Sequence, residues 1–383
     1  MNSAAEPILD VIIGCDCDPD RPGYGGTRYD TRAALTWRGI EEGVPRLREI
    51  ADAATSDQAN PVRITWCIRS DLQMREVHGD CAWPAERFGA LWTALARAGD
   101  EIAWHPHLWR WDGGAHCWYQ EIEDADWIAE CLDAGHRALL RQTGRAPLTS
   151  RTGWEFHNNA TMDAMRRLGI RVDFSAIPGR YTPGGSDRWG SRFNCHVDWR
   201  GTPETPYAPS AADYRRPAQE GEPADLLEVP MSVLHSGLLR FARVARRVCA
   251  GRRAALRELV GGDASASAAG GNKLYVTMPP VLFARLVVQQ LLRARQSGRA
   301  MLVTALHPDE MCVTGRGLTA THHPAHVRAN LAELLRRADR AGVRVRFTTP
   351  AELQGEAEGA SSLHAAMQAA DECVTGPRAL CSC

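Results

Sequence analysis

The sequence predicts an α/β fold built on a parallel β-sheet. Short apolar, strand-like runs alternate with amphipathic helical stretches along most of the chain, and polar residues gather where those runs end. The chain has 383 residues and 44% hydrophobic content, so it can bury a large core. This length fits a single α/β barrel or two smaller domains.

Eight short apolar runs, bounded by turn residues, are predicted as strands. They are Ile8–Cys15, Val62–Ile68, Glu101–His105, Leu148–Arg151, Val172–Ser175, Leu226–Pro230, Met301–His307 and Val343–Thr348. Six longer stretches carry apolar residues at i, i+3 and i+4 with charged residues opposite, which predicts helices. They are Thr36–Ala54, Ala85–Arg97, Ala125–Thr143, Asn159–Leu168, Pro280–Ser297 and His326–Ala341.

Two regions interrupt this alternation. Residues 179–223 are rich in Pro, Gly and Trp and too long for an ordinary connection, so we expect a loop that caps the barrel mouth. The alternative is a loop that only shields hydrophobic surface. Residues 261–272 have low complexity and predict a flexible surface loop. We therefore expect one domain over residues 8–353, followed by a poorly ordered or partly helical tail at 354–383.

Composition excludes several classes of partner. The formal net charge of -1 and the lack of a long basic run argue against nucleic-acid or anionic-membrane binding. The first residues show no signal-peptide pattern, and no segment supplies the roughly 20 apolar residues of a membrane span. We expect a cytoplasmic protein. The twelve cysteines are scattered, which favours free thiols over a disulfide framework.

Asp16 and Asp18 close the first predicted strand. Residues i and i+2 of a strand point the same way, so two carboxylates would meet on one face unless a metal ion or a shared proton relieves their repulsion. This pattern predicts an active site. The alternative is a solvated turn, because residues 18–23 (DPDRPG) are typical of loops. Cys15 and Cys17 flank Asp16 as alternative soft ligands, but strand alternation would aim them away from the carboxylates.

Other polar residues follow the carboxyl ends of later strands, where α/β folds place their sites. They are Asp71, His105 and His107, Arg151, Asp173 and Ser175, and His307. His105 and His107 stand at i and i+2 across a proline and can offer two imidazoles to one ion. With Asp18 they predict an open three-ligand metal site, although His107 could equally be a surface or core histidine.

The site is rich in tryptophan. These rings suit stacking on a sugar face, and core packing is the alternative. The residues predicted to contact substrate are Trp104, Trp109, Asp71, Trp154, Asp173, Asp198 and Trp199.

Several segments, taken in order, resemble the polysaccharide deacetylase superfamily, which includes carbohydrate esterase family 4. They are Asp16-Cys17-Asp18, residues 99–105 (GDEIAWH), 151–154 (RTGW), 168–175 (LGIRVDFS), Leu306-His307 and 347–353 (FTTPAEL). The order and spacing match over about residues 8–353.

The resemblance implies a distorted (β/α)7-type barrel that removes acetyl groups from N-acetylated sugars with a divalent metal, usually zinc. By position, Asp16 resembles the family's general base and Asp18 a metal ligand. His105 matches the first metal histidine, Arg151 the arginine that orients the base, and His307 the general acid. The implied reaction is metal-assisted amide hydrolysis.

One position departs from the family pattern. The second metal histidine of the family lies four residues after the first, where this chain has Trp109. Either His107 replaces it, or the ion is held more weakly, or the metal has been lost. We expect a hydrolase that removes an N-acyl group from a small soluble sugar or sugar-containing metabolite. The alternatives are a hydrolase of a cyclic amide and a non-catalytic carbohydrate-binding barrel.

Overall fold

The computed structural model describes residues 6–20, 31–54, 60–182, 196–234, 272–313 and 322–356. Eight strands form one sheet with the order β10-β7-β6-β3-β2-β1-β13, and β14 pairs with β1. Every pairing in this sheet is parallel. The strands are β1 (Ile8–Cys17), β2 (Thr65–Arg69), β3 (Glu101–His105), β6 (Thr149–Ser150), β7 (Val172–Asp173), β10 (Leu227–Glu228), β13 (Arg299–Leu306) and β14 (Arg344–Phe347).

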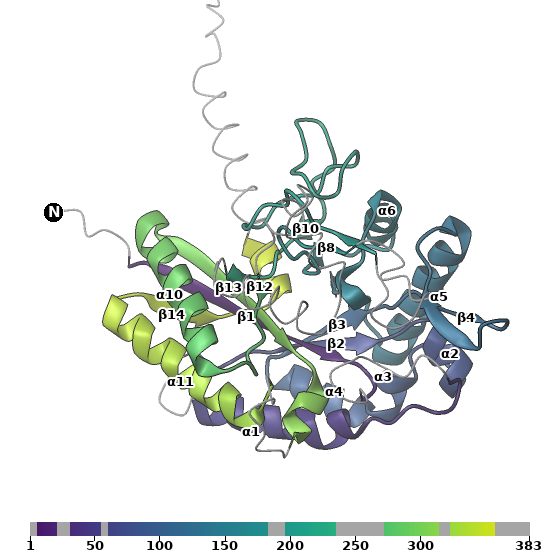
Figure 1. The fold of residues 1–383 in the computed structure, drawn as a ribbon, viewed down its shortest axis with the longest axis horizontal. Coiled ribbons are helices and arrows are strands. Elements are labelled where there is room, and N and C mark those ends of the chain that lie inside the picture. Colours follow the sequence, from purple (N-terminus) through teal and green to yellow (C-terminus); the bar gives the residue numbers. More distant parts are fainter. Residues whose placement is uncertain are drawn as a thin grey trace, which may run out of the picture.

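Helices surround this curled sheet (Figure 1). They are η2 (Gly39–Gly43), α1 (Val44–Ala54), α2 (Leu72–His78), α3 (Trp83–Arg87), α4 (Gly89–Arg97), α5 (Ala125–Thr143), η3 (Gly153–Glu155), α6 (Asn159–Arg167), α10 (Pro280–Ser297), η4 (Pro308–Cys312) and α11 (Pro324–Ala341). Three two-stranded antiparallel sheets are added in the described residues: β4 (Trp109–Asp112) with β5 (Cys117–Gln120), β8 (Tyr181–Thr182) with β9 (Val197–Asp198), and β11 (Val233–Leu234) with β12 (Asn272–Lys273). No helix in the described part of the chain is long and apolar enough to cross a bilayer.

The predicted fold class is confirmed. A parallel, curled sheet with helices around it is a distorted (β/α)7-type barrel, and all eight predicted strands occur. Helical structure occurs in all six predicted helix regions, with Ala85–Arg97 divided between α3 and α4, and some of these helices have clear end signals. Asp124 caps α5 by accepting from the Trp127 N–H, and Gly144 ends the helix with a φ of 70°. The short helix α2 and the two-stranded sheets were not predicted.

The predicted loops are described in part. The 179–223 region contains the β8–β9 pair, and residues 183–195 within it lie outside the described residues. The low-complexity loop 261–272 lies outside them except for Asn272. In the predicted tail, residues 354–356 end a helical segment that begins at residue 350, and 357–383 lie outside the described part. The single-domain boundary at 8–353 stays a prediction.

β1 is the central strand. It pairs with β13 along one side, and on its other side with β14 through Ile8–Val11 and with β2 through Gly14–Cys17. Its two faces enter two hydrophobic clusters, as expected for a strand buried on both sides. Cys15 and Cys17 lie in the cluster opposite that of Ile12, so the expectation that they point away from the carboxylates is confirmed.

The cysteines of the described residues are free thiols, as predicted. They are Cys15, Cys17, Cys67, Cys81, Cys117, Cys131 and Cys312.

A close backbone approach fixes the turn that follows β13. A Cβ on Gly43 would stand 2.1 Å from the Pro308 carbonyl oxygen, and one on Gly39 would stand 2.6 Å from the Asp309 nitrogen. Only glycine lets η2 lie this close to η4. The position of His307, which precedes η4, therefore depends on this contact.

We predict that Gly43→Ala destabilises the protein by about 1–3 kcal/mol, since the overpacked Cβ meets backbone that has no side chain to move aside. Urea unfolding would measure this. Gly89→Ala is the matched control, because a Cβ there meets nothing within 4 Å; equal stability losses in both variants would contradict the packing explanation.

Candidate active site

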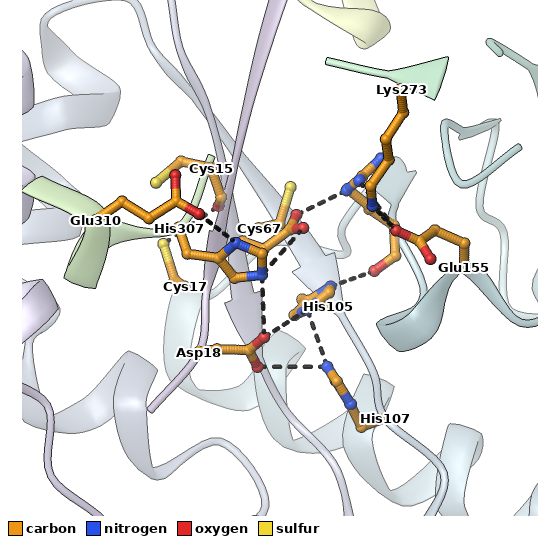
Figure 2. A network of polar contacts seen from close by, with 12 residues as sticks. Cys15, Cys17, Asp18, Cys67, His105, His107, Glu155, Lys273, His307 and Glu310 are labelled. Carbon is orange, nitrogen blue, oxygen red and sulfur yellow. Dashed lines mark hydrogen bonds and ion pairs between the residues drawn. The ribbon is translucent and has the colours of Figure 1, made fainter. Parts of the chain in front are cut away.

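Three side chains that could hold a metal ion converge at the carboxyl ends of β1 and β3. The ligand atoms of Asp18, His105 and His107 lie within 4.8 Å of one another, and all three residues are buried. Asp18 Oδ2 lies 3.5 Å from His105 Nε2, and Asp18 Oδ1 lies 3.3 Å from His107 Nε2. Figure 2 shows the two imidazoles and the carboxylate facing one point. Parallel pairing brings these strand ends to the same edge of the sheet.

The donor set fits a divalent metal ion. The Nε2 atoms of His105 and His107 lie 3.1 Å apart. Two neutral imidazole lone pairs at this distance repel unless a proton or a cation lies between them. His105 Nδ1 lies 2.5 Å from the Arg151 carbonyl oxygen, and donation to that oxygen directs the Nε2 lone pair toward Asp18. Two imidazoles and one carboxylate are typical zinc ligands that leave a position open.

Arg69 donates to the carboxylate of this cluster. The sequence analysis did not predict this residue. Its fully buried guanidinium donates to Asp18 Oδ1 at 2.8 Å, to Asp71 Oδ2 at 2.7 Å and to Gln73 Oε1 at 2.8 Å. Asp71 also accepts from the His107 backbone N–H at 3.1 Å. Asp71, which was predicted to contact substrate, therefore accepts hydrogen bonds from Arg69 and from the backbone of His107. An arginine ending the apolar run of β2 was the available sign.

Burial and charge set the protonation states of the ligands. Burial opposes ionisation of Asp18, but His107 and His105 outweigh it and hold its pKa well below the usual range. Burial and the nearby Arg69 lower the pKa of His107 to about 4. Burial opposes protonation of His105, but Asp18 and Asp16 raise its pKa. His107 is therefore a neutral imidazole at neutral pH, which is the form that binds metal.

Asp16 lies beside the cluster as an ionised carboxylate. Its Oδ1 accepts from Arg151 Nε at 2.7 Å, and its Oδ2 lies 3.8 Å from His307 Nε2. Arg151 is itself fixed by donation to the Phe174 carbonyl at 2.7 Å. Burial raises the pKa of Asp16, but Arg151, His105 and His307 together lower it. One carboxylate oxygen is thus held by the arginine, and the other faces the site.

His307 follows β13 on the opposite side of the cluster. Its Nε2 lies 3.8 Å from both Asp16 Oδ2 and Asp18 Oδ2. Its Nδ1 lies 3.4 Å from Glu310 Oε1, and Thr277 Oγ1 donates to the other oxygen of Glu310 at 2.6 Å. Nδ1–H donation to Glu310 would turn Nε2 toward the two aspartates.

The predicted tryptophans divide into two pairs. Trp104 and Trp199 are fully buried, and their indoles donate to the carbonyls of Ser70 and Glu155 at 3.0 and 2.8 Å. Trp109 stacks on His107 with 5.8 Å between ring centroids, and Trp154 meets Trp109 edge to face. Trp109 therefore packs against the face of the His107 ring. Contact of any of these rings with substrate stays a prediction.

Asp173 and Asp198 lie outside the ligand cluster. Asp173 is fully buried, accepts from Ser150 Oγ at 2.5 Å and lies 3.3 Å from His157 Nε2. Asp198 pairs with Arg200 at 2.8 Å and with Arg215 at 2.6 Å. Both carboxylates are engaged within the chain, and their roles toward substrate stay predictions.

Matches to known proteins are structural. No family model matches the sequence, and no curated protein matches it. A Mycobacterium smegmatis protein assigned to the polysaccharide deacetylases is 17% identical with a TM-score of 0.47, covering 94% of this chain and 95% of its own. PuuE allantoinase is 15% identical with a TM-score of 0.46, covering 91% and 89%.

A family 4 carbohydrate esterase from Streptomyces lividans, solved with acetate, is 8% identical with a TM-score of 0.35, covering 91% of this chain and 95% of its own. Two of these three structures carry names from the superfamily that the sequence motifs resemble. None of the three TM-scores reaches 0.5, so we take the chemistry from the side chains themselves.

Gly153 makes room for the His107 ring. A Cβ at this position would lie 2.1 Å from His107 Cδ2. We predict that Gly153→Ala weakens zinc binding about 10- to 100-fold, the usual effect of losing a group that orients a ligand. Calorimetric titration with zinc would measure this, with Gly113→Ala as control because a Cβ there meets nothing within 4 Å. Unchanged affinity would show that His107 is not a ligand.

Metal binding should release a proton from His105. Because the pKa of His105 is raised and that of His107 is about 4, the proton that competes with the ion near neutral pH belongs to His105. As the pH falls below the His105 pKa, apparent zinc affinity should drop about tenfold per pH unit. Calorimetry in buffers of different ionisation enthalpy would count the released protons. Affinity independent of pH, or two protons released, would contradict this assignment.

Proposed function

We propose that the protein is a zinc-dependent amide hydrolase that removes an N-acyl group, most simply acetyl, from a small sugar or sugar-containing metabolite. The observation that carries the proposal is the junction of the Asp18–His105–His107 cluster with Asp16 and His307 at one end of the barrel. Asp16 and Asp18 come from the end of β1, His105 and His107 from the end of β3, and His307 from the end of β13, and such a convergence of base, ligands and acid suits metal-assisted hydrolysis.

The chain's own residues divide the work. A divalent ion held by the cluster would acidify water and polarise the amide carbonyl. Asp16, kept ionised and oriented by Arg151, takes the proton of the attacking water through its Oδ2. His307 delivers a proton from Nε2 to the departing amine, with its ring oriented by Glu310 at Nδ1.

A catalytic role explains the buried charged residues of the site better than carbohydrate binding alone does. Two carboxylates and two arginines are removed from water here, and such burial generally gives little net stability. A carbohydrate-binding barrel needs no buried base, acid and metal ligands at separate strand ends. The non-catalytic alternative therefore leaves the main feature of the site without a role.

A second candidate is hydrolysis of another amide bond, such as that of a cyclic amide. Two departures from the pattern of the polysaccharide deacetylase superfamily favour it. Trp109 stands where that family has its second metal histidine, and Arg69 donates to the same Asp18 carboxylate that His105 and His107 face. Release of acetate from N-acetyl sugars, against ring opening without acetate, separates the two reactions.

We predict that zinc-loaded protein releases acetate from N-acetylated sugars and that Asp16→Asn and His307→Gln each lower kcat about 10²- to 10⁴-fold while zinc remains bound. His105→Ala should reduce the zinc stoichiometry itself. His116→Asn, at an exposed hairpin position with a φ of 50°, is the control and should retain both properties. A wild-type protein that holds no stoichiometric divalent ion, with no activity on adding one, would refute the metal-dependent reaction.

A further inference from the structure

The only lysine of the chain stands at the wall of the candidate active site. Lys273 is the one exception among 45 cationic Lys and Arg residues. Its ammonium contacts the Glu155 carboxylate and lies 4.8 Å from the centroid of the Tyr275 ring. Figure 2 shows Lys273 reaching from β12 toward Glu155, on the far side of His105 from Asp18. The proposed roles of base, acid and metal ligand involve other residues, so the mechanism assigns no role to Lys273.

One side chain, Tyr275, separates Lys273 from His307, and two side chains, Glu155 and Arg151, separate it from Asp16. Its partner Glu155 lies 4.0 Å from Nη2 of Arg151, the arginine that holds Asp16. Its other neighbour, Tyr275, has its ring centroid 5.9 Å from that of His307. A substrate with its amide between Asp16 and His307 would therefore need to extend only a short way to meet the ammonium.

The cluster around Glu155 carries excess positive charge. Arg180 Nη1 lies 3.1 Å from Glu155 Oε2, so two cations share one carboxylate. The Glu155 side chain is 9% exposed, whereas Arg180 is 30% and Lys273 13% exposed. Arg180 is thus the most accessible member of the cluster, and Lys273 and Glu155 are both nearly buried. An ammonium has three donors and a guanidinium five, so both retain donors beyond those that Glu155 can accept.

A lysine at this position suits contact with a small anionic group of a ligand. An ammonium is a compact charge that can lie over a tyrosine ring and bind an oxyanion at the same time. A guanidinium presents a planar fork and needs more room. The single use of lysine at this position is therefore consistent with direct contact to a ligand.

We propose that Lys273, assisted by Arg180, binds an anionic group, a carboxylate or a phosphate, that the N-acylated substrate carries near its amide. Glu155 is the counter-ion of the two cations before substrate arrives. The inference rests on the proposed function in that it names the substrate class of the same site.

Equilibrium binding tests the proposal without turnover. The probes are neutral N-acetylglucosamine, N-acetylmuramic acid with its carboxylate, and N-acetylglucosamine 6-phosphate, titrated into the Asp16→Asn protein with and without zinc. We expect one of the anionic probes to bind more tightly than the neutral probe. Adding Lys273→Met should lower this anionic preference about 10- to 100-fold, as for loss of a charge-assisted hydrogen bond. The probe that responds identifies carboxylate or phosphate.

Two further variants separate binding from structural support. Lys273→Arg should keep part of the anionic preference, and Glu155→Gln should strengthen anion binding because it frees both cations. Weaker binding in both Glu155→Gln and Lys273→Met would mean that the cluster only supports the fold, and would overturn the proposal. Arg145→Met, at an exposed position, is the matched loss-of-charge control.

The outcomes also separate this inference from the proposed function. If wild-type protein releases acetate but shows no preference among the three probes, the anion site is refuted and the hydrolase stands. If no acetate is released while Lys273-dependent anion binding persists, the anion site stands and the proposed reaction fails.

Discussion

Two buried arginines hold two buried carboxylates at the end of one strand, and the rest of the site depends on this. Asp16 lies near the end of β1 and Asp18 directly follows the strand, so their charges would repel in a medium with little water. Arg151 and Arg69 are 1% and 0% exposed and each donates to one of them. Burial opposes ionisation of both carboxylates, but Arg151 lowers the pKa of Asp16, and His107 and His105 lower that of Asp18, so a base and a metal-binding carboxylate are available together.

The same arginines connect the histidines to the carboxylates. The Arg151 carbonyl oxygen orients His105 through Nδ1, while its guanidinium holds Asp16. Arg69 reaches Asp71, which accepts the backbone N–H of His107. The ends of β1, β2, β3 and β6 are therefore joined by one polar network. A shift of any strand end would disturb ligand and base together.

The turn η3 contacts both the Asp18–His105–His107 cluster and Lys273. Gly153 packs against the His107 ring, Trp154 meets Trp109, and Glu155 pairs with Lys273. Trp154 and Glu155 adopt φ values of 59° and 54°, the left-handed region, which costs of the order of 1–3 kcal/mol for each such residue. Surrounding contacts hold this strained turn in place, so one short segment supports both the proposed metal site and the proposed anion site.

Local sequence determined the strands, the main helices and part of the site. Apolar runs and helix caps such as Asp124 act within a few residues, and strand ends placed Asp16, Asp18, His105, Arg151 and His307 at one edge once a parallel sheet was predicted. The site residues that were missed join segments far apart in the chain: Arg69 with Asp18, Glu310 with Thr277, and Lys273 with Glu155. Their side chains fit no local period, and only the folded chain brings them together. Tertiary structure likewise decided that His107 faces His105 and that Trp109 stacks behind it, because the path of the chain after β3 directs these rings, and spacing alone left both choices open.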